Sequence, residues 1–125
     1  MRILHTSDWH LGRTLHKVSM AEAQEEAMRQ IGLIASDEDV DLIVVAGDVF
    51  DHAIPSADAL DLRERTLASL LTVAPVVVTA GNHDSLRRLG YGSSLFTAGL
   101  HVCTTIEQID RPVVLDDVRV YPIPY

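Results

Sequence analysis

Residues 42–51 read LIVVAGDVFD, and this stretch decides the fold. Residues 42–46 are all apolar and show no polar alternation, which is typical of a β-strand covered on both faces in a parallel sheet. Gly47 follows at once and lets the chain turn sharply, so that Asp48 places its carboxylate at the edge of the sheet. The stretch therefore predicts a buried strand that ends in a polar site.

Two more stretches share this arrangement. Residues 2–7 predict a strand that leads into DWH at 8–10, and residues 76–80 predict a strand that leads into GNHD at 81–84. Ligand sites in parallel sheets lie beyond the carboxyl ends of the strands. We therefore expect the three motifs to meet at one edge of the sheet.

Helical patterns separate the three strands. Residues 19–37 carry apolar side chains at helical spacing, and Ser19 with Glu22 has the spacing of a capping box. Residues 56–71 predict a second helix, with Ser56 as its N-cap.

The rest of the chain is less regular. Residues 85–98 are weakly helical and are interrupted by glycines, and residues 100–123 read as short strands. The expected fold class is α/β, with a β-α-β-α-β core and a mostly parallel sheet, because such crossovers are right-handed and make neighbouring strands parallel.

The side chains in the three motifs are those that bind divalent metal ions. Asp8 and His10 are two residues apart and can reach one ion, Asp48 can bridge two ions, Asn82 offers an amide oxygen and His83 an imidazole. Oxygen donors with some imidazole suit Mn²⁺, Fe²⁺ or Zn²⁺. Two such ions about 3.5–4 Å apart activate a water and hold the attacking and leaving oxygens of an in-line displacement.

Each motif alone also has an ordinary structural explanation, such as a turn or a helix cap. Their shared order, each after an apolar run, favours the metal site. For the other aromatic and imidazole side chains we expect structural roles: Trp9 packs and fixes its loop, His5 is packed or hydrogen-bonded, and His16 and His101 lie on the surface. His52 adjoins the last acid of the second motif and could support the site.

Composition limits the other possibilities. At 125 residues the chain is one domain at most, and no apolar run approaches the roughly 18 residues that span a bilayer. Cys103 is the single cysteine, which fits a reducing compartment, so we expect a cytoplasmic protein without membrane association. The net charge of −8 argues against nucleic-acid binding, although bound cations would offset the charge of some acids.

The three motifs, in this order, resemble those of the calcineurin-like metallophosphoesterases. Within that superfamily the stretches MRILHTSDWHLG at 1–12, VAGDVFD at 45–51 and VYPIPY at 120–125 resemble the SbcD family of bacterial nuclease subunits, in the double-strand-break repair branch. The resemblance extends over essentially the whole chain.

The resemblance implies a role for each motif residue. Asp8, His10 and the bridging Asp48 would hold one divalent ion, and Asp48 with Asn82 would hold the other; Mn²⁺ is the ion we expect. Two further roles follow in the third motif. His83 would protonate the leaving oxygen or stabilise the transition state, and Asp84 would orient His83.

The resemblance also implies a substrate and partners. The substrate would be DNA, cut exonucleolytically at duplex ends and endonucleolytically at hairpins, and the partner an SbcC-like SMC ATPase. The nuclease subunit would form a homodimer through helices near 56–72 and 85–98. The family has two more histidine motifs, Gly-His and Gly-His-x-His, that this sequence lacks. Residues 1–125 are therefore expected to be the N-terminal portion of a nuclease domain within a larger α/β sandwich, incomplete and inactive alone.

Two alternatives remain open. The chain could belong to another calcineurin-like phosphoesterase, such as a protein phosphatase or a cyclic-nucleotide phosphodiesterase. Protein phosphatases of the superfamily have Arg-Gly after the second motif, where this chain has His52-Ala53. It could also be a catalytically inert fragment or interaction module.

Overall fold

The computed structural model describes residues 1–96 and 99–125. A parallel four-stranded sheet lies at its centre, and the strand order is β1-β4-β5-β6. Its strands are β1 (Ile3–Thr6), β4 (Leu42–Ala46), β5 (Val76–Thr79) and β6 (Leu100–Cys103). The expected α/β class with a mostly parallel sheet is confirmed.

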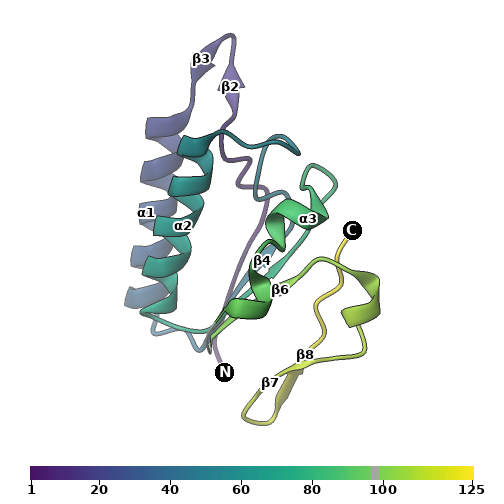
Figure 1. The fold of residues 1–125 in the computed structure, drawn as a ribbon. Coiled ribbons are helices and arrows are strands. Elements are labelled where there is room, and N and C mark those ends of the chain that lie inside the picture. The colour runs from purple at the N-terminus through teal and green to yellow at the C-terminus, as the bar shows by residue number, and fades with distance from the viewer. Residues whose placement is uncertain (97–98) are drawn as a thin grey trace.

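Both long helices cover the same face of this sheet (Figure 1). They are α1 (Ala21–Asp37), which connects β1 to β4, and α2 (Ala57–Leu71), which connects β4 to β5. Each new strand is added next to the previous one, so successive right-handed crossovers place their helices on one side. The main hydrophobic core lies between these helices and the sheet.

The opposite face is covered by a short antiparallel hairpin of β7 (Val113–Leu115) and β8 (Val118–Val120). Val113 packs there against Leu42 and Val77. The two central strands are thus covered on both sides, which explains why their sequences are continuously apolar. The edge strand β1 is less protected, and His5 is exposed there, so the expectation of a packed imidazole was wrong.

The first helix begins later than the sequence predicted. A second hairpin, β2 (Thr14–Leu15) with β3 (Val18–Ser19), precedes α1 and projects beyond the end of that helix in Figure 1. Ser19 pairs with Thr14 in this hairpin, and its hydroxyl accepts a hydrogen bond from the amide of Ala21 at 3.2 Å. The capping box with Glu22 therefore does not form. In α2, Ser56 is the N-cap and accepts from the Ala59 amide at 3.3 Å, as expected.

The segment after β5 is not one helix. It contains α3 (Leu86–Leu89) and a 3₁₀ turn η1 (Ser93–Leu95), separated where Gly92 adopts a φ of 73°. Another 3₁₀ turn, η2 (Ile106–Gln108), follows β6. The predicted helical range 85–98 extends to residues 97–98, which lie outside the described residues. Within the described ranges, no helix is long and apolar enough to cross a membrane.

Two glycines allow the second and third motifs to touch. Gly47 has a φ of 82°, and a Cβ added to it would lie 3.0 Å from the Cα of Gly81. A Cβ on Gly81 would collide with the backbone nitrogen and the Oδ1 of Asp48. The close approach of the two loops therefore requires glycine at position 81.

We predict that Gly81→Ala lowers the free energy of unfolding by about 1–3 kcal/mol, since a backbone atom of Asp48 must move to make room. Urea denaturation measures the change. Gly32→Ala is the matched control, because a Cβ there meets only the Ser69 hydroxyl at 3.8 Å and alanine favours a helix by up to about 1 kcal/mol. Equal stability of the two variants would contradict the close approach at Gly81.

Candidate metal centre

The first two motifs run side by side beyond their strands. The amide of Asp8 donates to the carbonyl of Gly47 at 3.1 Å, and the amide of His10 donates to the carbonyl of Asp48 at 3.0 Å. The parallel pairing of β1 and β4 thus continues into the loops, and an isolated bridge joins Leu11 and Phe50. The sheet register therefore sets which side chains of the two motifs face each other.

Three residues of the first two motifs have left-handed backbone conformations. The φ angles are 55° at Asp8, 45° at His10 and 49° at Asp48. Non-glycine residues adopt this region in only a few per cent of cases, although aspartate and histidine do so more often than most. Such strain gathers at functional sites, and here it falls on three of the residues predicted to bind metal.

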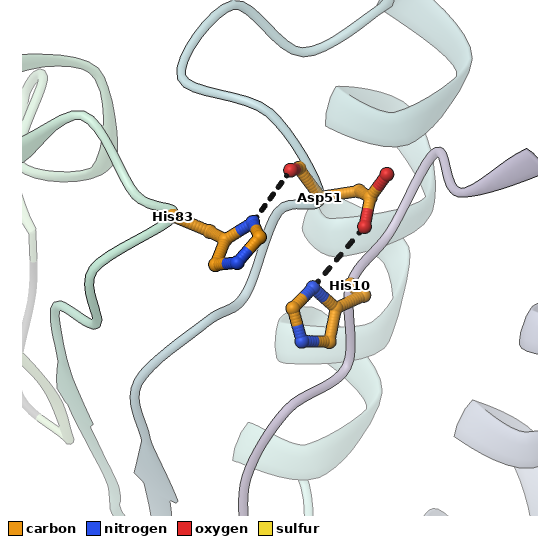
Figure 2. Close-up of side chains that lie close together, drawn as sticks. All are labelled: His10, Asp51 and His83. Carbon is orange, nitrogen blue, oxygen red and sulfur yellow. Dashed lines mark hydrogen bonds and ion pairs between the residues drawn. The ribbon is translucent and has the colours of Figure 1, made fainter.

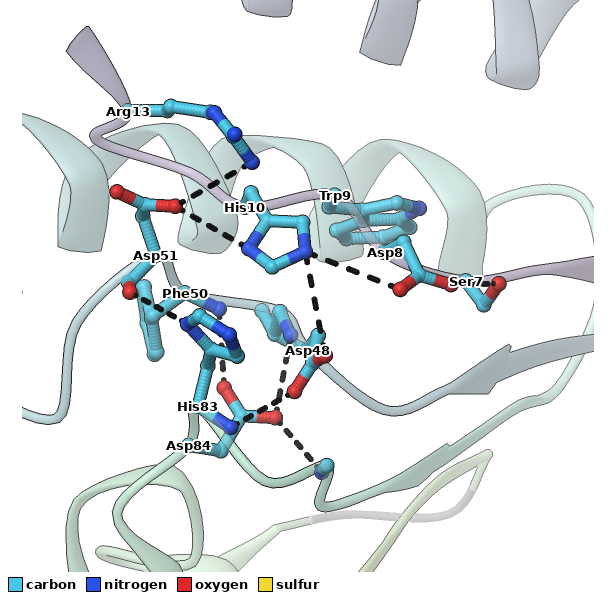
Figure 3. Close-up of polar contacts among 12 residues, drawn as sticks. Ser7, Asp8, Trp9, His10, Arg13, Asp48, Phe50, Asp51, His83 and Asp84 are labelled. Atoms are coloured by element: carbon cyan, nitrogen blue, oxygen red, sulfur yellow. Dashed lines mark hydrogen bonds and ion pairs between the residues drawn. The ribbon is translucent and has the colours of Figure 1, made fainter.

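The side chains of these three residues converge (Figure 3). His10 Nε2 lies 3.8 Å from Asp8 Oδ1 and 3.9 Å from Asp48 Oδ2. One donor atom from each residue lies within 4.8 Å of the other two, a spacing that suits one cation at about 2.1 Å from each donor. His10 and Asp48 are mostly buried, but the Asp8 side chain is 65% exposed, so the cluster is open to solvent on one side. The residues present fit a divalent ion.

Asp51 joins the first and third motifs, a position that sequence reasoning did not identify. Its carboxylate Oδ1 is 3.2 Å from His10 Nδ1, and its backbone carbonyl is 2.9 Å from His83 Nδ1 (Figure 2). The two imidazole rings meet edge to face, with centroids 4.8 Å apart. The available signal was the second acid of the VAGDVFD stretch at 45–51, to which the sequence alone assigned no role.

The contact between His10 and Asp51 is close but poorly directed. His10 Nδ1 is fully buried and, within the described part of the chain, has no partner that meets hydrogen-bond geometry. The ion-pair distance of 3.2 Å nevertheless places Asp51 Oδ1 within reach. Leaving such a nitrogen unsatisfied costs about 1–3 kcal/mol.

Asn82 lines a cavity that Asp48 also lines. That cavity has a volume of about 350 Å³, and residues 46–48, 79–82 and 123–125 line it. The amide of Tyr125 donates to the Ala80 carbonyl at 2.9 Å, which holds the C-terminal segment against the third motif. Asp48 thus faces both the His10 cluster and the cavity next to Asn82.

Asp84 is 8% exposed, and its carboxylate joins two loops. It accepts hydrogen bonds from the amides of Val49 at 3.1 Å, Phe50 at 2.9 Å and Gly81 at 3.0 Å (Figure 3). The predicted contact with the His83 ring is replaced by the Asp51 carbonyl. Asp84 therefore fixes the backbone that carries His83 instead of orienting the imidazole itself.

A cation lies near this buried carboxylate. Burial lowers the pKa of the Arg63 guanidinium, whereas the charges of Glu64 and Asp84 act in the opposite direction and raise it. The Nε of Arg63 is fully buried without a hydrogen-bond partner in the described ranges. The attraction to Asp84 thus offsets part of the desolvation of the Arg63 guanidinium.

The remaining side chains lie mostly as expected. Trp9 is 6% exposed and its Nε1 donates to the Thr6 hydroxyl at 3.0 Å, so it packs and fixes its loop. His16 and His101 are exposed. His52 is 75% exposed, with Nε2 at 3.3 Å from Asp51 Oδ2.

Comparison with known proteins defines the class. The sequence model of the calcineurin-like phosphoesterase family matches residues 1–121, and the chain belongs to this family. Among curated proteins it is similar to the SbcD subunit of the SbcCD nuclease from Staphylococcus epidermidis, with 38% identity over 128 aligned residues. The corresponding protein of Staphylococcus saprophyticus is 37% identical over the same length. Each alignment includes the whole chain but only 34% of the relative. The chain therefore spans about a third of the length of these relatives.

We predict that Asp84→Asn lowers the free energy of unfolding by about 2–4 kcal/mol. In the unaltered protein three backbone amides donate to the Asp84 carboxylate, whereas the NH₂ group of asparagine is itself a donor and would face one or more of them. Thermal or urea unfolding measures the loss. Asp61→Asn, at an exposed carboxylate on α2, should change stability by about 0.5 kcal/mol or less. A neutral effect at Asp84 would show that its hydrogen bonds do not hold the loops.

Proposed function

We propose that this chain is the metal-binding part of a DNA nuclease subunit that hydrolyses phosphodiesters at duplex ends and in hairpins. The observation that carries the proposal is the convergence of Asp8, His10 and Asp48 at the sheet edge, next to His83. The family supports phosphoester hydrolysis, and the names of the relatives support a nuclease.

The proposed cofactors are two divalent ions, with Mn²⁺ the preferred one. Asp8, His10 and Asp48 would hold one, and Asp48 with Asn82 would hold the other beside the cavity at the third motif. When bound, such ions supply a nucleophilic water and neutralise charge on the phosphate. Asp48 is mostly buried, and the amide of His83 donates to its Oδ1 at 2.9 Å, so the bridging carboxylate is held in place before any ligand arrives.

His83 is the proposed proton donor to the leaving oxygen. The His83 residue is exposed to solvent, and its Nδ1 contacts the Asp51 carbonyl oxygen. That contact fixes the ring next to His10 and leaves Nε2 as the nitrogen that exchanges a proton with the substrate. Asp84 supports this role indirectly by holding the loop.

The surface around the site fits a nucleic acid better than the net charge suggests. Four basic residues follow the first and third motifs closely in sequence and are exposed: Arg13, Lys17, Arg87 and Arg88. Cations here would meet the backbone of DNA while the acids of the site are neutralised by metal ions.

We also propose the family's assembly for the longer protein. An SbcC-like SMC ATPase would be the partner, and two nuclease subunits would pair through α2 and the 85–98 region, in the cytoplasm. Exposed apolar side chains support that surface: Leu60, Leu86, Tyr91 and Leu95. Since residues 85–96 do not form a continuous helix, the pairing surface would consist of α2, α3 and the turn that follows.

In the longer protein, His83→Ala should reduce nuclease turnover by about 10²–10⁴-fold, because the proton donor is lost. Mn²⁺ affinity should change little, since the proposed ligands remain. Cleavage of linear duplex DNA and calorimetry measure the two effects, and His101→Ala, at an exposed imidazole on β6, is the control. A variant with near-normal turnover would remove His83 from the mechanism.

We expect the 125-residue chain by itself to bind Mn²⁺ weakly and to cleave no DNA. The visible donors leave each ion short of protein ligands, and two-metal catalysis needs both ions in fixed positions. Calorimetry and a gel assay on duplex DNA, run in parallel on this chain and on a protein of the relatives' length, make the comparison. Tight two-site binding with cleavage by the short chain would mean that its own residues complete the site.

A further inference from the structure

A glutamine of the first helix contacts the backbone of the first motif. Gln24 is partly buried in the first turn of α1, where its own amide donates to the Met20 carbonyl at 2.9 Å. Its side-chain oxygen accepts a hydrogen bond from the Gly12 amide at 3.1 Å. Its Nε2 donates to the carbonyl of Trp9 at 3.2 Å and also to that of His10. One side chain of α1 thus contacts three backbone groups in and just after the first motif.

These partners fix the orientation of the Gln24 amide. A backbone carbonyl only accepts and a backbone N–H only donates, so the NH₂ group must face Trp9 and His10 while the oxygen faces Gly12. A glutamate here would bring a carboxylate oxygen against two carbonyl oxygens, and a methionine of similar length would offer neither group. The position therefore uses both the donor and the acceptor of a glutamine side chain.

The contacts matter because of the backbone conformation of His10. Its φ of 45° lies in the left-handed region, and such a conformation persists only where the surrounding structure holds it. The His10 amide donates to the Asp48 carbonyl at 3.0 Å, and the His10 carbonyl accepts from the Gln24 side chain and from the Arg13 amide. The second motif and α1 thus hold the two peptide groups on either side of the His10 Cα.

Gln24 also closes the base of the hairpin that lies between the first motif and α1. The strands β2 and β3 pair with each other, and the Met20 amide donates to the Arg13 carbonyl at 3.1 Å. The contact between Gln24 and Gly12 continues this series of bonds toward the motif. The first motif is therefore attached to α1 directly as well as through the projecting hairpin.

We propose that Gln24 is a positioning residue for His10, which holds the backbone of the first motif in the conformation that brings the imidazole to Asp8 and Asp48. The proposal rests on the proposed function, in which these three side chains hold a divalent ion. Because the side chain of Gln24 bonds to backbone groups, it acts through His10 and not as a ligand.

The first measurement reads the contact without metal or activity. A protein of the relatives' length is freed of metal with a chelator, and hydrogen exchange at the Gly12 amide is followed by mass spectrometry. Gln24→Met keeps the length and helix propensity of glutamine but removes both hydrogen-bonding groups, so exchange at Gly12 should become about tenfold faster. Gln24→Glu keeps an accepting oxygen and should restore the protection of this amide.

The matched control is Gln30→Met. Gln30 is an exposed glutamine on the same helix, and its Nε2 donates to Glu26 at 2.7 Å, away from the motif. This variant should leave both the exchange at Gly12 and the Mn²⁺ affinity unchanged.

A second measurement separates positioning from stability. Mn²⁺ calorimetry, in conditions where every variant is folded, should show about 10–100-fold weaker binding for Gln24→Met at unchanged stoichiometry. A purely structural role would lower the urea midpoint and leave the Mn²⁺ affinity unchanged, and that result would overturn the proposal, as would unchanged exchange at Gly12. If the unaltered protein bound no Mn²⁺, the proposed function would fail and this role of Gln24 with it. Normal binding by both proteins would refute the role of Gln24 alone.

Discussion

The buried carboxylate of Asp84 is the interaction on which the site depends. It belongs to the third motif, yet two of its three hydrogen bonds go to amides of the second motif, at Val49 and Phe50. A charged acceptor shared by three backbone donors is among the stronger polar contacts available inside a protein. This carboxylate links the loop after β4 to the loop after β5. The linked loops carry Asp48, Asp51 and His83.

The strands supply the second half of this arrangement. Because β1 pairs in parallel with β4, the first motif continues beside the second and brings Asp8 and His10 to Asp48. The sheet register therefore joins the first motif to the second, and Asp84 joins the second motif to the third. Neither long helix contributes a side chain to this cluster. Both helices pack on one face of the sheet, and this packing holds the strands that carry the site.

Sequence alone was sufficient where the physical signal was strong and local. Residues 42–46 are continuously apolar because both faces of β4 are covered, and the carboxyl ends of parallel strands must meet, which brought Asp8, His10 and Asp48 together. The hairpin at 14–19 was missed because it is short, and its turn uses His16 and Lys17 in left-handed conformations that no glycine marks. The contacts of Asp51 and Asp84 depend on which loops touch in three dimensions, and no periodicity or spacing encodes that.

The left-handed backbone at Asp8, His10 and Asp48 affects how these positions tolerate change. Asparagine and aspartate adopt this conformation more readily than alanine does, because their short polar side chains bond to the local backbone. An alanine at any of the three positions would alter the shape of the loop together with its charge. Natural variation at Asp8 and Asp48 should therefore be confined to asparagine and, where the side chain is dispensable, glycine.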